Sequence, residues 1–218
     1  MEEARLTVPV IITVLHLINL FCLIILIRSG LQILYDHPKL YWTDHTRDDN
    51  WWIRFGKKIQ PKDRLWTARD EAEVPPKATL ALPGGEHNLG TGRHWHFSAA
   101  LLWVITGVIY IGYMLLSGDW TRLIPTSWEV IPEAIAMMGN YLTLNIMAEG
   151  AQYNALQQLS YAFIVFILAP LQILTGLAMS PALTGKYPGL LKIFGGQRQV
   201  ARSLHFLAMI GFSLFILI

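Results

Sequence analysis

The sequence Gly92-Arg93-His94-Trp95-His96-Phe97 opens a long apolar segment, and Arg202-Ser203-Leu204-His205-Phe206 opens the last apolar segment of the chain. In each, a histidine lies a few residues inside the apolar run and an arginine precedes it by three residues, about one helical turn. A histidine within hydrocarbon costs free energy unless a function uses it. His96 and His205 are therefore candidate functional residues.

The apolar residues are gathered into long runs. Hydrophobic residues make up 53% of the 218 residues and charged residues only 15%, against about 25% charged in typical soluble proteins. A membrane span needs about 20 apolar residues, and four stretches meet that length. The sequence predicts an all-α integral membrane protein with a single domain over 1–218, a four-transmembrane-helix bundle with spans at about 6–27, 95–116, 158–179 and 200–218 and a polar loop over 28–92.

Charge and cysteine content exclude several classes of site. The net charge of +2 gives no indication of nucleic-acid binding. The only cysteine, Cys22, lies within the first apolar run, which excludes an internal disulfide and a cysteine-ligated zinc or iron–sulfur centre. Only Arg5 precedes the first run as a basic residue, so this run is predicted to be a retained span and not a signal peptide.

The segments between the spans leave two interpretations open. The tryptophans of the polar loop favour a position at the bilayer surface, either as a solvated loop or as a docking surface for another subunit. Residues 132–148 are predicted to form a helix at the membrane interface, and Pro170 is predicted to kink the third span. The last span is still apolar at Ile218, so the natural chain is expected to continue.

The rotation of a helix separates His94 from His96. Two residues correspond to about 200° of rotation, so the two rings point to nearly opposite sides. The face of His96 continues through Ala99, Ala100 and Trp103, and its small residues leave room for a flat macrocycle. We therefore expect His96 to be the ligand and His94 to be an interfacial residue.

His96 and His205 enter from the same membrane side in a four-span topology, so they can supply both axial ligands of one haem iron. Arg93 and Arg202, one turn nearer the surface, would then lie where the haem propionates emerge. The other possibility for such histidines is a hydrogen bond between helices. Three further histidines lie in the polar loop, where solvation is the expected state: His37, His45 and His87.

His16 lies nearer the middle of its span, and no other histidine of the chain matches its depth. A residue directly after Ile218 would lie about 21 Å deeper than His205 at 1.5 Å per residue. That depth suits a second haem held by His16 and a ligand beyond Ile218.

Several short stretches, spread over nearly the whole chain, resemble the di-haem b-type cytochromes with four helices that serve as membrane subunits of hydrogenases, formate dehydrogenase and thiosulfate reductase. The stretches are Leu15-His16-Leu17-Ile18-Asn19, Ser29-Gly30-Leu31-Gln32-Ile33, His37-Pro38-Lys39-Leu40-Tyr41-Trp42, Arg93-His94-Trp95-His96-Phe97, Tyr153-Asn154-Ala155-Leu156-Gln157, Thr175-Gly176-Leu177-Ala178-Met179-Ser180-Pro181, Phe194-Gly195-Gly196 and Arg202-Ser203-Leu204-His205-Phe206.

This resemblance implies two haem b groups, one held by His96 and His205 and one by His16; the fourth ligand of the family is missing from the supplied sequence. It also implies electron transfer between a quinone, either menaquinone or ubiquinone, and a partner oxidoreductase subunit. That partner would be periplasmic or membrane-peripheral and would contain molybdopterin or an iron–sulfur centre. The chain would be a multi-pass protein of the bacterial inner membrane, not a complete enzyme alone. Asn154, Gln157 and Glu149 are candidates for a quinone site, although the first two could simply cap a helix.

The resemblance conflicts with the distribution of charge. The family arrangement puts both termini in the cytoplasm, whereas the basic residues gather in 28–93 and 180–202, with only Arg5 and Arg122 on the other side. We favour the family arrangement. The alternative function is a haem-free membrane anchor or assembly subunit, while a transporter lacks support because the spans carry no paired carboxylates.

Overall fold

The computed structural model describes residues 9–47, 49–56, 63–65, 70, 72–73, 81–83, 88–144 and 153–217. Within these residues four helices are long and apolar enough to cross a membrane: α1 (Val10–Asp36), α3 (Leu89–Ser117), the continuous helix Ala155–Met179 and α9 (Arg198–Leu217). The predicted all-α membrane bundle is confirmed. The first two helices exceed their predicted ranges: α1 continues to Asp36, and α3 begins at Leu89.

The start of α3 has a local cause. The Asn88 side chain accepts a hydrogen bond from the Thr91 N–H at 2.8 Å, which satisfies one of the free donors of the first turn. At the other end Gly118 adopts φ 79°, a left-handed conformation that favours glycine and stops the helix. The predicted end of this span at Ser117-Gly118-Asp119 agrees with that termination.

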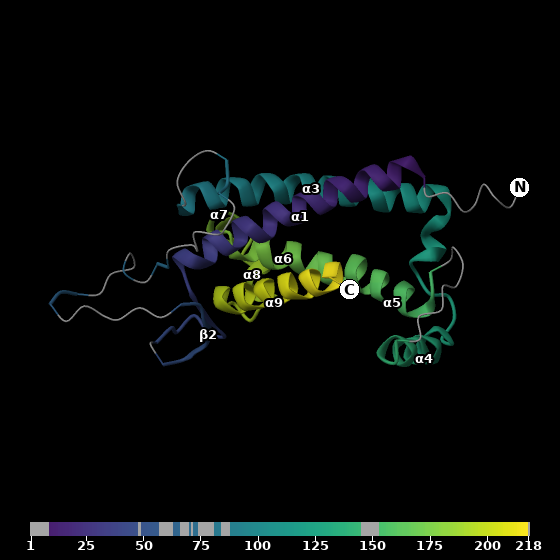
Figure 1. The fold of residues 1–218 in the computed structure, drawn as a ribbon. Coiled ribbons are helices and arrows are strands. Elements are labelled where there is room, and N and C mark those ends of the chain that lie inside the picture. The colour runs from purple at the N-terminus through teal and green to yellow at the C-terminus, as the bar shows by residue number, and fades with distance from the viewer. Residues whose placement is uncertain are drawn as a thin grey trace, which may run out of the picture.

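The four long helices form two pairs that lie as two layers (Figure 1). α1 packs along α3, and α6 (Ala169–Met179) packs along α9. The layers meet through the buried side chains of Leu168, Ala208 and Phe212, against which Leu23 and Trp103 pack. Because close backbone contacts lie mainly within each pair, the side chains between the pairs define the interior of the bundle.

The third span is a helix with a wider turn inside it. α5 (Ala155–Phe163) continues through η3 (Ile164–Leu168), a π-helical turn, into α6. Pro170 follows directly; it lacks an N–H, and its ring would clash with the carbonyl one turn earlier in a regular helix. The π turn supplies the local adjustment that lets the span continue past this proline.

The polar connection contains a small hairpin. β1 (Lys39–Tyr41) pairs antiparallel with β2 (Trp51–Arg54), with an irregular register between Leu40 and Tyr41. The hairpin is tied to α9, because Trp52 Nε1 donates to Ser203 Oγ at 2.8 Å and Ser203 Oγ donates to the Tyr41 carbonyl at 2.6 Å.

The first turn of α9 is capped from the same connection. The Asp44 carboxylate accepts from the N–H groups of Arg198 and Gln199 at 3.0 and 2.8 Å, a favourable place for a negative charge. A polar segment far away in the sequence therefore fixes where the last span begins.

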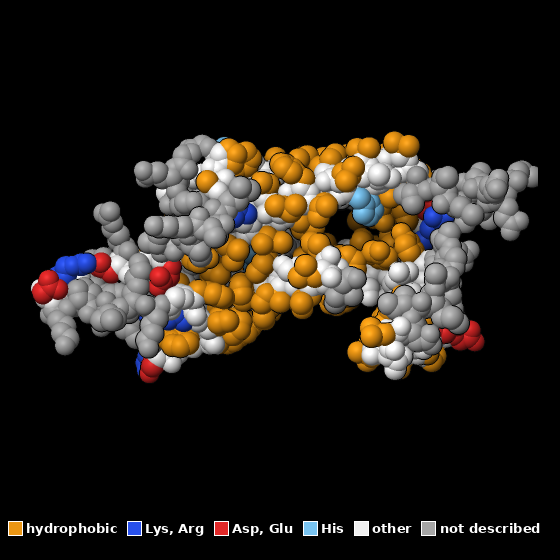
Figure 2. All heavy atoms as spheres, in the orientation of Figure 1, with side chains coloured by type: hydrophobic (Ala, Val, Ile, Leu, Met, Phe, Trp, Pro, Cys, Tyr) orange, Lys and Arg blue, Asp and Glu red, His pale blue; other side chains and the backbone are white. Residues whose placement is uncertain are grey.

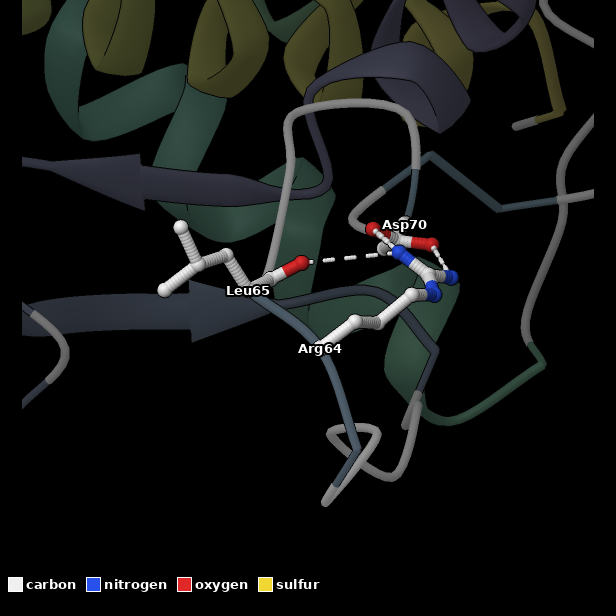
Figure 3. A network of polar contacts seen from close by, with 3 residues as sticks. All are labelled: Arg64, Leu65 and Asp70. Atoms are coloured by element: carbon white, nitrogen blue, oxygen red, sulfur yellow. Dashed lines mark hydrogen bonds and ion pairs between the residues drawn. The ribbon is translucent and has the colours of Figure 1, made fainter.

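Further along this connection, Arg64 and Asp70 form a forked ion pair, and Arg64 Nη1 also donates to the Leu65 carbonyl (Figure 3). The hydrogen bonds to Asp70 and its charge raise the pKa of Arg64. The pair is exposed to solvent, where such bridges are screened. We therefore take it as a local feature of the connection.

Shorter helices lie at both ends of the bundle: η2 (Asp119–Arg122), α4 (Val130–Leu142), α7 (Pro181–Lys186) and α8 (Gly189–Lys192). α4 is set apart from the long helices (Figure 1), and it exposes Ile131, Ile135 and Met138 on one face. Its 13 residues correspond to the first part of the predicted interfacial helix, which was expected to reach residue 148.

The outer surface of the bundle is apolar. Figure 2 shows hydrophobic side chains covering the long helices, with charged side chains gathered toward the two ends. Leu17, Phe21, Leu101 and Val108 are among the exposed apolar residues. A surface of this kind suits lipid, as expected for membrane-spanning helices.

Candidate functional site

His96 of α3 and His205 of α9 face each other across the two layers. Their ring centres are 6.1 Å apart, and the ring planes are inclined by 59°. Imidazole nitrogen binds a metal at about 2 Å, and the ring centre lies about 1 Å further away. Two imidazoles on opposite sides of one iron would therefore have centres about 6 Å apart, which agrees with the observed separation.

The other nitrogen of His96 contacts α1. Ser29 Oγ lies 3.0 Å from His96 Nδ1 and also donates to the Ile25 carbonyl at 2.6 Å. A hydroxyl has one proton, so here the oxygen accepts and His96 Nδ1–H donates. In the neutral ring Nε2 then keeps its lone pair, which is the form that binds a metal.

His205 is held in the same way by α6. Thr175 Oγ1 lies 2.9 Å from His205 Nδ1 and donates to the Leu171 carbonyl at 2.7 Å. The amide Nε2 of Gln172, a donor only, lies 3.0 Å from His205 Nε2. Both contacts assign the proton to Nδ1 and the lone pair to Nε2.

The Gln172 side chain lies where a haem iron bound to His205 would have to be. Its amide nitrogen contacts the lone pair of His205 that a haem iron would take, so haem binding requires this side chain to turn aside. Its Oε1 is buried and finds no hydrogen-bond donor among the described residues. A polar amide left half-satisfied next to a ligand nitrogen is consistent with a site built for a further group.

The space around the two rings is lined by small residues. A Cβ at Gly30 would lie 3.5 Å from His96 Cε1, and a Cβ at Gly176 would lie 3.4 Å from His205 Cε1. A methyl group at either position would reach ordinary contact distance from the ring, so each glycine leaves that space open beside the histidine. Ala99 and Ala208, one turn after the histidines, are buried and also small. The residues present fit a bis-histidine haem.

Arg93 and Arg202, which precede His96 and His205 by one helical turn, differ in their contacts. Arg202 donates to the backbone carbonyls of Lys39, at 2.9 Å, and of His37, so it links α9 to the segment that leaves α1. Arg93 is exposed at the start of α3. His94 is exposed as well, on the side away from the paired histidines. The propionate role of Arg93 and Arg202 stays a prediction.

His16 lies at the other end of the bundle and does not join His96 and His205. Its Nδ1 is 2.9 Å from the Ile12 carbonyl, so Nδ1 carries the proton and Nε2 keeps the lone pair. Tyr110 of α3 meets the ring edge-on, with centres 5.6 Å apart. The His16 side chain is exposed.

The candidate quinone residues are capping residues in this structure. Asn154 and Gln157 form a reciprocal capping box at the start of α5, and Asn154 Nδ2 donates to Tyr141 Oη at 2.8 Å. Nearby, the rings of Tyr153 and Tyr161 lie 4.9 Å apart. Glu149 and His87 lie outside the described residues, and the quinone role of all three candidates stays a prediction.

The sequence alone did not indicate the residues that contact His96 and His205: Ser29, Gly30, Gln172, Thr175 and Gly176. A weak signal was present, because Ser29-Gly30 and Thr175-Gly176 are both a hydroxyl residue followed directly by glycine, a pattern that Thr106-Gly107 shares. The sequence alone does not tell which helices lie side by side, so this signal could not be connected to His96 and His205.

A protein family and a relative match this chain. The family described as prokaryotic cytochrome b561 matches residues 7–218. A protein of Azospira oryzae, the putative protein-methionine-sulfoxide reductase subunit YedZ1, is 30% identical over 138 residues, which cover 62% of this chain and 64% of that protein. The chain thus spans less than two thirds of the length of this relative. No solved structure matches the chain.

Proposed function

Because the chain belongs to the prokaryotic cytochrome b561 family, we propose that His96 and His205 hold a haem b that passes electrons between a membrane quinone and a partner oxidoreductase. Family membership and the four spans make the chain a b-type cytochrome subunit of the bacterial inner membrane that transfers electrons. The observation that carries the residue assignment is the pair of facing imidazoles, 6.1 Å apart.

The roles of the residues follow from their placement. The haem, when bound, supplies a one-electron redox step. His96 and His205 supply its axial ligands, and the buried helices around them exclude water and so influence its potential. Arg93, at the surface end of α3, would favour the ionised form of a propionate.

The proposal extends to a second haem b at His16. The His16 Nε2 lone pair is available, because Nδ1 is used by the Ile12 carbonyl. We propose that the whole chain forms one membrane domain around the two haems.

A quinone, menaquinone or ubiquinone, would exchange electrons at the His16 end. Tyr110 and Tyr161 lie on helices at this end, and Tyr153, Asn154 and Gln157 lie at the start of α5. Phenol and amide groups can form hydrogen bonds with quinone carbonyls. Glu149 is proposed as a proton carrier for the same site.

The partner would be the catalytic subunit of a reductase. The relative from Azospira oryzae is described as a putative subunit of a protein-methionine-sulfoxide reductase, and a molybdopterin or iron–sulfur protein would suit the family resemblance. We place this partner on the exported side, next to the hairpin and the start of α9, since these lie at the His205 end.

A reduced-minus-oxidised visible spectrum of the purified chain, with a pyridine-haemochrome count, tests the proposal. A bis-histidine b-type spectrum with two haems per chain is the result expected for both sites, and one haem would leave only the His96/His205 site. A folded protein without haem, made with sufficient haem supply, would refute the assignment and favour the haem-free anchor.

A further inference from the structure

We infer that Ser29 and Thr175 are positioning residues for the axial ligands, whose hydroxyl groups accept Nδ1–H of His96 and His205 and thereby lower the reduction potential of the haem between them. This inference rests on the proposed ligation by His96 and His205. It adds a role for two residues on α1 and α6, the helices that carry neither ligand of this haem.

A hydroxyl residue followed by a glycine lies beside each of the two histidine rings. In α1, Ser29 contacts His96 Nδ1 at 3.0 Å, and at Gly30, the next residue, a Cβ would lie 3.5 Å from His96 Cε1. In α6, Thr175 contacts His205 Nδ1 at 2.9 Å, and Gly176 follows in the same position. Each helix pair therefore presents its histidine with the same two features: a hydroxyl acceptor and a glycine under the ring.

Each hydroxyl is restricted to the acceptor role toward its histidine. The protons of Ser29 and Thr175 are directed to their own helices, to the carbonyls of Ile25 and Leu171 at 2.6 and 2.7 Å. Both side chains are fully buried, with 0% exposure. The backbone of Leu26 and of Gln172 also interacts with the rings of His96 and His205. The hydroxyl groups are the buried side-chain acceptors at Nδ1, and they favour the tautomer that leaves the lone pair on Nε2.

A hydrogen bond accepted from the outer nitrogen increases the basicity of the ligating nitrogen. A more basic ligand stabilises the higher charge of ferric iron relative to ferrous iron. Two such bonds, one on each side of the iron, act in the same direction. The haem at His96 and His205 should therefore be harder to reduce than the same haem without the hydroxyl groups.

The test is a redox titration of the haem-loaded full chain, followed in the visible α-band. Thr175→Val keeps the side-chain shape and removes the hydroxyl, and Ser29→Ala removes the hydroxyl on the other side. At a fixed ambient potential each variant should raise the ratio of reduced to oxidised haem several-fold, where tenfold corresponds to 59 mV for one electron. The double variant should shift further in the same direction.

Two variants separate a hydroxyl effect from a packing effect. Thr175→Ser is smaller but keeps the hydroxyl, so it should retain the potential of the unchanged protein. Ser213→Ala removes a hydroxyl of α9 that donates to the Met209 carbonyl at 2.9 Å, as Ser29 donates to its own helix. This control should leave the haem at His96 and His205 unshifted.

The outcomes distinguish this inference from the proposed function. Absence of haem from the unchanged protein, or full retention of haem by His96→Ala, refutes the ligation itself. With haem bound through His96 and His205, unshifted potentials in Thr175→Val and Ser29→Ala overturn the positioning role. If Thr175→Val loses haem, retention by Thr175→Ser supports the role of the hydroxyl, and equal loss in both overturns it.

Discussion

Trp103 of α3 and Phe212 of α9 meet edge to face, with ring centres 5.7 Å apart and planes inclined by 85°. Each follows the histidine of its own helix by seven residues, about 10 Å along the axis. The facing histidines and the facing aromatic rings are thus two successive contacts between the same helices. The aromatic contact belongs to the cluster of buried side chains that joins the two layers.

Phe212→Ala should therefore destabilise the contact between the layers. Phe212 is only 5% exposed, and truncation of a buried phenylalanine costs about 3–5 kcal/mol. The midpoint of thermal unfolding in detergent measures the effect, and haem retention should fall with it. Phe212→Leu keeps an apolar side chain and should lose much less; equal losses in the two variants would contradict the packing role.

His96→Ala should lose the haem of its site, whereas His94→Ala should lose little. His96 faces His205, but His94 is exposed on another side of α3. A pyridine-haemochrome count gives the measurement, and with two haems per chain about half should remain in His96→Ala. Similar losses in the two variants would refute the assignment by helix face.

The two arginines should respond differently to replacement by leucine. Arg202→Leu leaves two backbone carbonyls without their donor, at a cost of about 1–3 kcal/mol, and should loosen the attachment of the hairpin to α9. Limited proteolysis of the 37–56 segment reports this change.

Arg93→Leu should leave that attachment unchanged and lower a haem potential, because a nearby positive charge favours the added electron. A redox titration measures the shift. An unchanged potential in both arginine variants would exclude the propionate role.

Stability should fall as pH decreases, in part through His37. Burial lowers the pKa of His37, and the charges of Arg202 and Arg93 lower it further, while Asp36 opposes them. Since the folded-state pKa lies below the unfolded value of about 6.5, the unfolded chain binds more protons between the two values. The contribution of His37 is complete above about pH 6.5 and decreases as pH falls through the folded-state pKa.

Thermal unfolding between pH 7.5 and pH 5 measures this dependence. His37→Gln keeps the backbone carbonyl that accepts from Arg202, so the variant should show a flatter pH profile in the same range. An identical slope in the two proteins would show that His37 does not contribute.

Substitutions can distinguish quinone binding by Asn154 and Gln157 from their role in capping α5. Gln157→Leu should slow haem reduction by a quinol if its amide binds the quinone, with the haem spectrum unchanged. Asn154→Ser keeps a good capping residue, whereas Asn154→Ala should cost about 1 kcal/mol. If quinol reduction simply follows helix stability in these variants, both residues only cap α5.

The sequence was sufficient for the parts of the structure that depend on local pattern. Four apolar runs predicted four membrane helices, and Ser117-Gly118-Asp119 predicted the end of α3 because glycine accepts a left-handed conformation. The small residues after His96 predicted which of two histidines faces inward, and the structure places that ring opposite His205.

Other features depend on contacts between distant segments, which a local pattern does not encode. The hairpin of Lys39–Tyr41 and Trp51–Arg54 is too short for its alternation to be recognised, and it is held by Ser203 of α9. The pairing of Ser29 with His96 and of Thr175 with His205 requires knowledge of which helices are neighbours. The capping box at Asn154 was foreseen only as an alternative to quinone binding.

The two proposed axial ligands lie in different helix pairs, His96 in the pair of α1 and α3 and His205 in the pair of α6 and α9, so they are synthesised at different times. Ribosomes deliver α1 and α3 to the membrane first, with the ring of His96 already held by Ser29 from the same half. The opposite ligand emerges only with the final helix, whose first turn is capped by Asp44 from the earlier half. If His96 and His205 hold a haem as proposed, the pair is complete only after α9 has been synthesised. A chain that ends before α9 would carry one of the two histidines.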